Sequence, residues 1–202
     1  MGERIAEVKT LRSASKRAAT QKLAATPALF GEIRQPKSEY LAVPLITSEN
    51  RDYLTVAVMP PEVIANNKIG IIAQGTMTEF AFLSSKVFTV WNKTVSGRLK
   101  SDLNVSITIT YNNFPFPQVS EVEVAKLATL SNNVLSARDA HPGSSLADLY
   151  GAVSMPVELR KAHEQLDSYV LGIYKLSTNA SEPEVLARLF ELYAELSQSA
   201  KA

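Results

Sequence analysis

The stretch NVSITITYNNFPFPQVSEVE (residues 104–123) separates two parts of this chain that have different sequence patterns. Before it, short runs rich in β-branched and aromatic residues are broken by Pro, Gly and Asn, a pattern typical of a small β-sheet. These runs are YLAVPLI (40–46), YLTVAV (53–58), KIGIIA (68–73) and NVSITITY (104–111). After it, the alternation stops and apolar residues recur at helical spacing. We therefore predict an α+β fold in which a small sheet precedes a helical region.

Helical patterns begin and end the chain and also interrupt the predicted sheet. Residues 3–25 combine helical spacing with a basic exposed face and stop before Pro27, which predicts one basic N-terminal helix over residues 1–27. A stripe over 77–95 predicts a helix between the third and fourth strands. The chain is thus expected to divide into this basic helix, a sheet-containing domain over 28–118 and a helical region over 119–202.

The helical region contains three predicted helices. Ser120 with Glu123 and Ser181 with Glu184 have the spacing of capping boxes, and Pro156 stands near the start of the middle helix. We expect the last helix, with its wide apolar stripe from Val185 to Leu196, to pack on the middle one.

Composition excludes several classes of protein. The 202 residues include no Cys and two His, with 46% hydrophobic residues, enough to build a core. Disulfides, zinc–thiolate sites, iron–sulfur clusters and thiol nucleophiles are therefore excluded, and two histidines leave little room for a catalytic metal. No apolar run approaches the roughly 20 residues that span a bilayer, and the polar, basic N-terminus lacks the apolar core of a signal peptide. We expect a cytoplasmic protein without a membrane partner.

Charge is distributed unevenly between the two halves. Residues 1–117 carry 14 basic and 9 acidic side chains, whereas residues 118–202 carry 7 and 11. The halves are therefore expected to meet different partners. The basic face of the N-terminal helix is either a solvated surface or a surface that lies along a phosphate backbone.

Motifs that would support catalysis by this chain are missing. The eight glycines are scattered, and neither GxGxxG, GxxxxGK[ST] nor GxSxG occurs. The sequence HEQLD (163–167) resembles part of a zinc-protease motif, but it lacks a third ligand, so we expect a structural contact between His163 and Asp167.

The segment KTVSGRLKSDLNVSITITY (93–111) is the best candidate for a binding site. Donor and acceptor side chains at every second residue would point to one side of an extended segment, where they can read base edges. These are Arg98, Lys100, Asp102 and Asn104. The alternative is a polar hairpin arm at a sheet edge, in which Lys100 and Asp102 form only a surface ion pair.

Five segments of the chain, taken in order, resemble the C-terminal part of the type IIL, MmeI-like restriction-modification enzymes. They are FGEIRQP (30–36), SENRDYL (48–54), FLSSKVFTVWNKTVSGRLKSD (82–102), YNNFPFP (111–117) and LADLYGAVSMPVELRKAHEQLD (146–167). Enzymes of this family join an endonuclease domain, an adenine methyltransferase domain, a target-recognition domain and a C-terminal helical region. The resemblance covers nearly the whole chain and implies that it corresponds to the last two parts.

The resemblance implies that residues 28–118 form a target-recognition domain for double-stranded DNA. It places base-reading residues between Arg98 and Asn104. Further candidate DNA contacts are Lys93, Arg51 and Lys68, since lysines and arginines bind phosphates. The chain itself is expected to hold no cofactor and to catalyse no reaction. S-adenosylmethionine and Mg²⁺ would serve the methyltransferase and endonuclease domains, which are its expected protein partners.

Three alternatives remain open at this point. The chain is a DNA-recognition module, a purely structural or protein-interaction domain, or part of a complete methyltransferase. The start of the chain directly at a helix favours an expressed fragment over a separately encoded module.

Overall fold

The computed structural model describes residues 2–199, which form two compact units divided between Gln35 and Pro36. The first unit contains α1 (Gly2–Ser13), α2 (Ala18–Lys22) and the 3-10 turn η1 (Leu23–Ala25). The single helix predicted for residues 3–25 is therefore wrong, because the chain turns back between α1 and α2. Arg12 stabilises this turn by donating hydrogen bonds to the carbonyls of Leu23, Thr26 and Leu29 at 2.9–3.0 Å.

The second unit contains two small antiparallel sheets. The first has the order β3–β1–β4, with β1 (Tyr40–Pro44) between β3 (Ala57–Met59) and β4 (Ile69–Ala73). The second has the order β2–β6–β5, formed by β2 (Ile46–Thr47), β6 (Asp102–Asn104) and β5 (Arg98–Leu99). The predicted α+β class is confirmed, although the sheet residues are divided between two sheets.

Two of the predicted strands differ from the structure. Residues 53–56 are buried on both sides rather than alternately, and the Val56 carbonyl accepts a hydrogen bond from Arg138 at 2.6 Å instead of joining a sheet. Residues 107–111 form a π-helical turn, η2 (Ile107–Tyr111), in place of a strand. Ser106 caps this turn, and its carbonyl accepts from the Tyr111 N–H at 3.0 Å, so local hydrogen bonds override the β-like alternation.

The helix predicted over 77–95 consists of two helices, α3 (Met77–Leu83) and α4 (Lys86–Val95). Thr76 and Glu79 form a capping box at the start of α3. Ser85 then separates the helices, because its hydroxyl donates to the Phe82 carbonyl and accepts from the Phe88 N–H.

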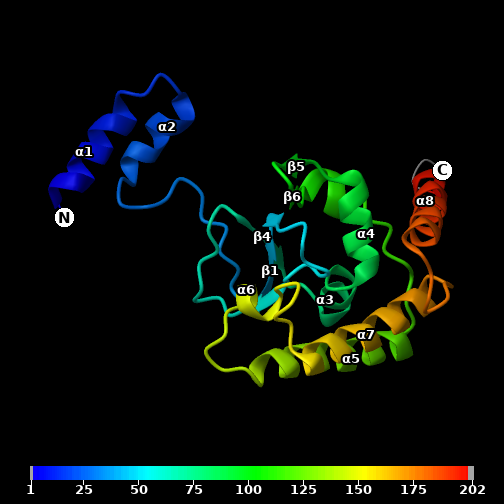
Figure 1. Cartoon of the computed structure of the whole chain (residues 1–202). Helices are drawn as coiled ribbons and strands as arrows, with labels where there is room; N and C mark the ends of the chain where they lie inside the picture. The colour runs from blue at the N-terminus through cyan, green and yellow to red at the C-terminus, as the bar shows by residue number, and fades with distance from the viewer. Residues whose placement is uncertain (1, 200–202) are drawn as a thin grey trace. The chain divides into compact units, whose positions relative to one another are not determined.

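The three C-terminal helices are observed, with boundaries close to those predicted. They are α5 (Glu121–Asp139), α7 (Val157–Ile173) and α8 (Glu182–Ser199), and a short helix, α6 (Leu146–Leu149), precedes α7. Figure 1 shows α5 and α7 side by side, which agrees with their extensive contacts. The predicted packing of α8 on α7 is wrong, because α8 packs mainly on α4, where Phe190 and Tyr193 lie against Trp91.

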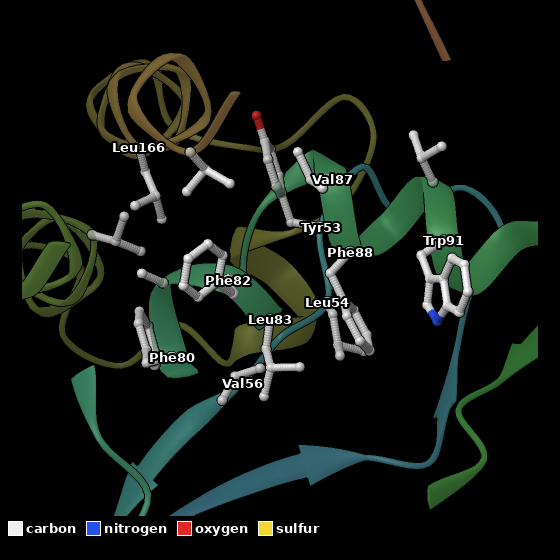
Figure 2. Packing of buried hydrophobic residues seen from close by; sticks show 14 of the residues in the cluster. Tyr53, Leu54, Val56, Phe80, Phe82, Leu83, Val87, Phe88, Trp91 and Leu166 are labelled. Atoms are coloured by element: carbon white, nitrogen blue, oxygen red, sulfur yellow. The ribbon is translucent and has the colours of Figure 1, made fainter. Parts of the chain in front are cut away.

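One hydrophobic core joins the sheet region to the helical region. It contains Phe80 and Phe82 of α3 and Phe88 of α4 together with Leu127 of α5 and Leu166 of α7, all less than 2% exposed. Figure 2 shows several of these side chains converging with the 53–56 segment. The position of the first sheet is therefore tied to helices that come later in the sequence.

Between Gly2 and Ser199, no helix has the length and apolar character that crossing a membrane requires.

Candidate nucleic-acid interface

The candidate residues 98–104 form a tight β-hairpin. Arg98 lies opposite Leu103, and Leu99 lies opposite Asp102. The two residues between the strands are Lys100 and Ser101, and Lys100 has a φ of 60°, the positive value that primed hairpin turns require at their first central position. The neighbouring strand β2 pairs only with Leu103 and Asn104. The tip from Leu99 to Asp102 therefore extends beyond the three-stranded part of the sheet.

The hairpin presents two faces with different residues. Residues directly opposite each other in an antiparallel pair point to the same face, and so do residues two apart on one strand. Leu99, Asp102 and Asn104 therefore share one face, whereas Arg98 shares the other face with the buried Leu103. The prediction that all four polar side chains lie on one side of an extended segment is wrong, because the turn at Lys100 interrupts that segment.

Arg98 and Lys100 occupy different environments. The Arg98 guanidinium donates to the Ser101 carbonyl at 3.0 Å and lies 3.6 Å from the Glu49 carboxylate. Arg98 is exposed, and its hydrogen bond to Ser101 links the two sides of the turn. Lys100 is exposed at the tip, and among residues 2–199 its ammonium group forms no ion pair, not even with Asp102.

Asp102 and Asn104 leave their polar groups available to a ligand. Asn104 is exposed and Asp102 is half-buried, and neither side chain has a hydrogen-bond partner within the described part of the chain. The backbone of Asn104 is nevertheless fixed, since its N–H donates to the Gly97 carbonyl at 3.0 Å. The hairpin thus places an acceptor and an amide on one face.

The other candidate residues are dispersed. Arg51 is half-buried in the loop that follows β2, and Lys68 is exposed just before β4. Lys93, in the last turn of α4, lies 3.2 Å from the Glu182 carboxylate at the start of α8. Its ammonium group therefore already has an acidic partner, unlike that of Lys100.

A buried polar network connects the sheet region to the C-terminal helices. Asp167 of α7 accepts hydrogen bonds from the Tyr53 hydroxyl at 2.9 Å and from the Lys86 N–H, at the start of α4, at 2.8 Å. Burial raises the pKa of Asp167 to about 6, although both hydrogen bonds favour the charged form. Burial, with a smaller contribution from Asp167, also raises the pKa of Tyr53.

His163 belongs to the same network, but through partners other than the expected Asp167. Its Nε2 lies 2.7 Å from the Tyr150 hydroxyl, which in turn accepts from the Arg138 Nε at 2.8 Å. Its ring stacks on Tyr53 with the two ring centroids 4.0 Å apart. Burial, followed by the charge of Arg138, lowers the pKa of His163 to about 3, so the imidazole is neutral. The role of His163 is structural, and the sequence motif around it does not form a metal site.

No metal-binding constellation is found between Gly2 and Ser199, where no three His, Asp or Glu side chains are placed to hold an ion. The candidate site among the described residues is instead a two-stranded hairpin carrying Lys100, Asp102 and Asn104.

Comparison with known families decides the identity of this architecture. Residues 1–118 match the family description "MmeI, target recognition domain", and residues 119–200 match "MmeI, C-terminal domain". The chain belongs to the MmeI family. It comprises a target-recognition domain followed by the C-terminal domain, and these two parts share the single core described above.

Two relatives agree with this assignment. The chain is 34% identical to DNA methyltransferase A of Bacillus subtilis (strain 168) over 196 residues, which are 97% of this chain and 22% of that protein. A solved structure of the type IIL restriction-modification enzyme MmeI in complex with DNA superposes with a TM-score of 0.87 at 34% identity. That match covers 97% of this chain and 26% of the MmeI chain. The chain therefore spans about a quarter or less of the relatives that it matches.

Two features of the hairpin were not found from the sequence. Leu99 is 55% exposed on the same face as Asp102, whereas the sequence pattern indicates only the polar residues of this segment. Glu49 approaches Arg98 from a distant part of the chain, and no local pattern indicates such a contact.

Proposed function

We propose that this chain selects the DNA sequence on which a larger restriction-modification adenine methyltransferase acts. The main support is the β5–β6 hairpin, whose exposed tip projects beyond the sheet and carries unpaired polar side chains. The major groove of B-DNA is wide enough to admit a two-stranded β-ribbon. The MmeI structure in complex with DNA supports the same assignment by similarity.

Base reading is assigned to Lys100, Asp102 and Asn104. A lysine can donate to the two acceptors on the major-groove edge of guanine, and a carboxylate can accept from the amine of the paired cytosine. Lys100, in the turn, and Asp102, on the adjoining face of the hairpin, would thus read one G·C pair together. The Asn104 amide matches the donor and acceptor of an adenine edge. The exposed methyl groups of Leu99 lie on the same face and suit contact with a thymine methyl group.

Phosphate contacts are assigned to other basic residues. Lys68 is exposed, and Arg51 is half-buried in the loop after β2. Arg98 and Lys93 are weaker candidates, because Glu49 and Glu182 already lie beside them. Contacts of this kind would fix the orientation of the module on the duplex without reading its sequence.

Catalysis is assigned to parts of the longer protein outside this chain. An adenine methyltransferase turns its target base out of the duplex into a pocket, and the present module would determine which adenine is presented. The methyltransferase domain would bind S-adenosylmethionine, and a fused endonuclease domain would require Mg²⁺. We expect calorimetry with this chain to detect no binding of S-adenosylmethionine, and micromolar binding would contradict this division of roles.

Fluorescence anisotropy with duplex DNA tests the proposal at its simplest level. The isolated chain should bind unselected duplex with a Kd of about 10⁻⁴ to 10⁻⁶ M, weakening steeply as salt is raised, because phosphate neutralisation dominates such binding. A purely structural or protein-interaction domain would show no binding at low salt, or binding that salt does not change.

A change of specificity tests the assignment of the hairpin. The segment should be grafted into a complete family member, with and without the paired changes Lys100→Glu and Asp102→Arg. Reversing donor and acceptor should shift the methylated sites from G·C to C·G at one position, with about 1 to 3 kcal/mol of discrimination at stake. An equal loss of methylation at all sites would mean that the pair has only a positional or structural role.

A further inference from the structure

The two ends of the recognition hairpin meet at one buried hydroxyl group. Ser96 lies just before β5, and Ser106 lies just after β6. The Ser106 N–H donates to the Thr110 hydroxyl oxygen at 3.3 Å, and the Thr110 and Ser96 hydroxyls are hydrogen-bonded to each other. The Ser96 hydroxyl also donates to Oδ1 of Asn92 in α4 at 2.5 Å.

The donors and acceptors in this cluster form a directed chain. Because Ser96 uses its single hydroxyl hydrogen on Asn92, the Thr110 hydroxyl must donate to Ser96 while it accepts from Ser106. The order is therefore Ser106 N–H, Thr110 hydroxyl, Ser96 hydroxyl and Asn92 carbonyl oxygen. Replacing Thr110 by a residue without a hydroxyl removes one hydrogen bond at each end of the hairpin.

Thr110 is itself held rigidly. It is completely buried, and Asn92 is 2% exposed. The Thr110 carbonyl accepts from the indole N–H of Trp91 at 2.9 Å, and its own N–H donates to the Ser106 carbonyl at 2.8 Å. The π-helical turn η2 places this side chain inward, although its neighbours Ile107 and Ile109 are 39% and 56% exposed. The hairpin base is thereby fastened to α4, the helix that carries much of the core.

We infer that Thr110 is a positioning residue for sequence recognition: its hydroxyl holds the two ends of the β5–β6 hairpin in the orientation in which the tip meets base edges. This inference rests on the proposed function of the hairpin. It does not require Thr110 to touch DNA, and its buried position excludes direct contact. Base readout depends on precise placement of side chains, whereas phosphate contacts made elsewhere on the surface do not depend on the hairpin.

Four variants of the complete chain separate positioning from general stability. Thr110→Val keeps the shape of the side chain and removes the hydroxyl, whereas Thr110→Ser keeps the hydroxyl and removes a buried methyl group. Thr47→Val is the matched control, because the Thr47 hydroxyl is buried in β2 beside β6 and has no hydrogen-bond partner. Ser96→Ala removes the hydrogen bonds of the Ser96 hydroxyl to Thr110 and Asn92. It replaces Thr110→Val in the experiment if that variant does not fold.

Selection from a library of duplexes with a randomised central segment supplies the readout. We expect the wild type, Thr110→Ser and Thr47→Val to enrich the same base pattern. Thr110→Val should lose about fivefold or more of the discrimination at the base pairs that the hairpin reads, while its affinity for unselected duplex changes by less than about twofold. Amide hydrogen exchange at Asn104 and Ser106 should be faster in Thr110→Val than in Thr110→Ser.

The possible failures are distinguishable. If the wild type enriches no pattern, the proposed recognition function fails, and the inference fails with it. If the wild type enriches a pattern that Thr110→Val and Ser96→Ala reproduce with equal sharpness, recognition stands and the positioning role of Thr110 is refuted. Equal loss of selectivity in Thr110→Ser and Thr110→Val would also refute it, because core packing rather than the hydroxyl would then control readout.

Discussion

The buried carboxylate of Asp167 makes a quantitative prediction about stability and pH. Its pKa is raised from an ordinary value of 3.8 to about 6, chiefly because burial penalises the charged form. A carboxyl group whose pKa is higher in the folded state stabilises the fold fully below its unfolded pKa. This contribution is lost as the pH rises through the folded pKa. Asp167 should therefore favour folding more at pH 5 than at pH 7.5.

The magnitude follows from linkage between protonation and folding. With pKa values of 3.8 unfolded and about 6 folded, the contribution of Asp167 to the free energy of unfolding falls by about 1 kcal/mol between pH 5 and pH 7.5. Asp167→Asn removes the titration. The free energy of unfolding of the variant, relative to that of the wild type, should therefore rise by about 1 kcal/mol over this interval. Comparing the two proteins cancels the contribution of His163, which both retain.

Urea unfolding at pH 5.0, 6.0 and 7.5, followed through the buried Trp91, measures this difference. Glu158→Gln is the matched control, since it removes an exposed carboxylate from the first turn of the same helix. A constant difference between the wild type and Asp167→Asn, or a shift of opposite sign, would refute the raised pKa.

Three further perturbations test the packing. Leu189→Asp should lower the free energy of unfolding by about 3 kcal/mol or more, because Leu189 is completely buried. The control Leu196→Asp should change it little, since Leu196 in the same helix is 40% exposed. An unchanged melting temperature for Leu189→Asp would mean that α8 does not pack on the rest of the protein. Arg138→Met should cost about 3 kcal/mol in chemical denaturation, since the Val56 carbonyl and the Tyr150 hydroxyl lose their donor, and a more stable variant would contradict this. Arg12→Ala should accelerate amide exchange over residues 18–25 without changing the melting temperature of the second unit, and slow exchange there would show that Arg12 does not stabilise the turn.

Much of the fold could be predicted from the sequence where the controlling interactions are local. The helix that follows Ser120 begins at a capping box and continues with helical spacing, and both signals lie within a few residues of each other. The strands β1 and β4 were likewise recognised from their β-rich runs. The segments that resemble the MmeI family also depend on the sequence alone, and they correctly placed the chain in that family.

The sequence indicates residues 98–104 as a candidate site, but it does not predict their geometry. Alternation of polar residues over 98–104 is compatible with one extended strand and with a hairpin, because both have a period of two. The structure selects the hairpin, with a turn at Lys100, and so separates Arg98 from Asp102 and Asn104. A residue with positive φ such as Lys100 has no sequence signal, since glycine or asparagine normally occupies that position.

Tertiary contacts decided the remaining features. Residues 53–56 read as a strand, yet Arg138, far along the chain, satisfies the Val56 carbonyl and removes the need for a sheet partner. Residues 104–111 also read as one strand, yet Trp91 and Ser106 stabilise a π-helical turn that buries Thr110. The sequence by itself determined the three C-terminal helices, the strands β1 and β4 and the family, because these depend on neighbouring residues. Only the folded chain decided which distant donors meet these carbonyls, and how the β5–β6 hairpin is held.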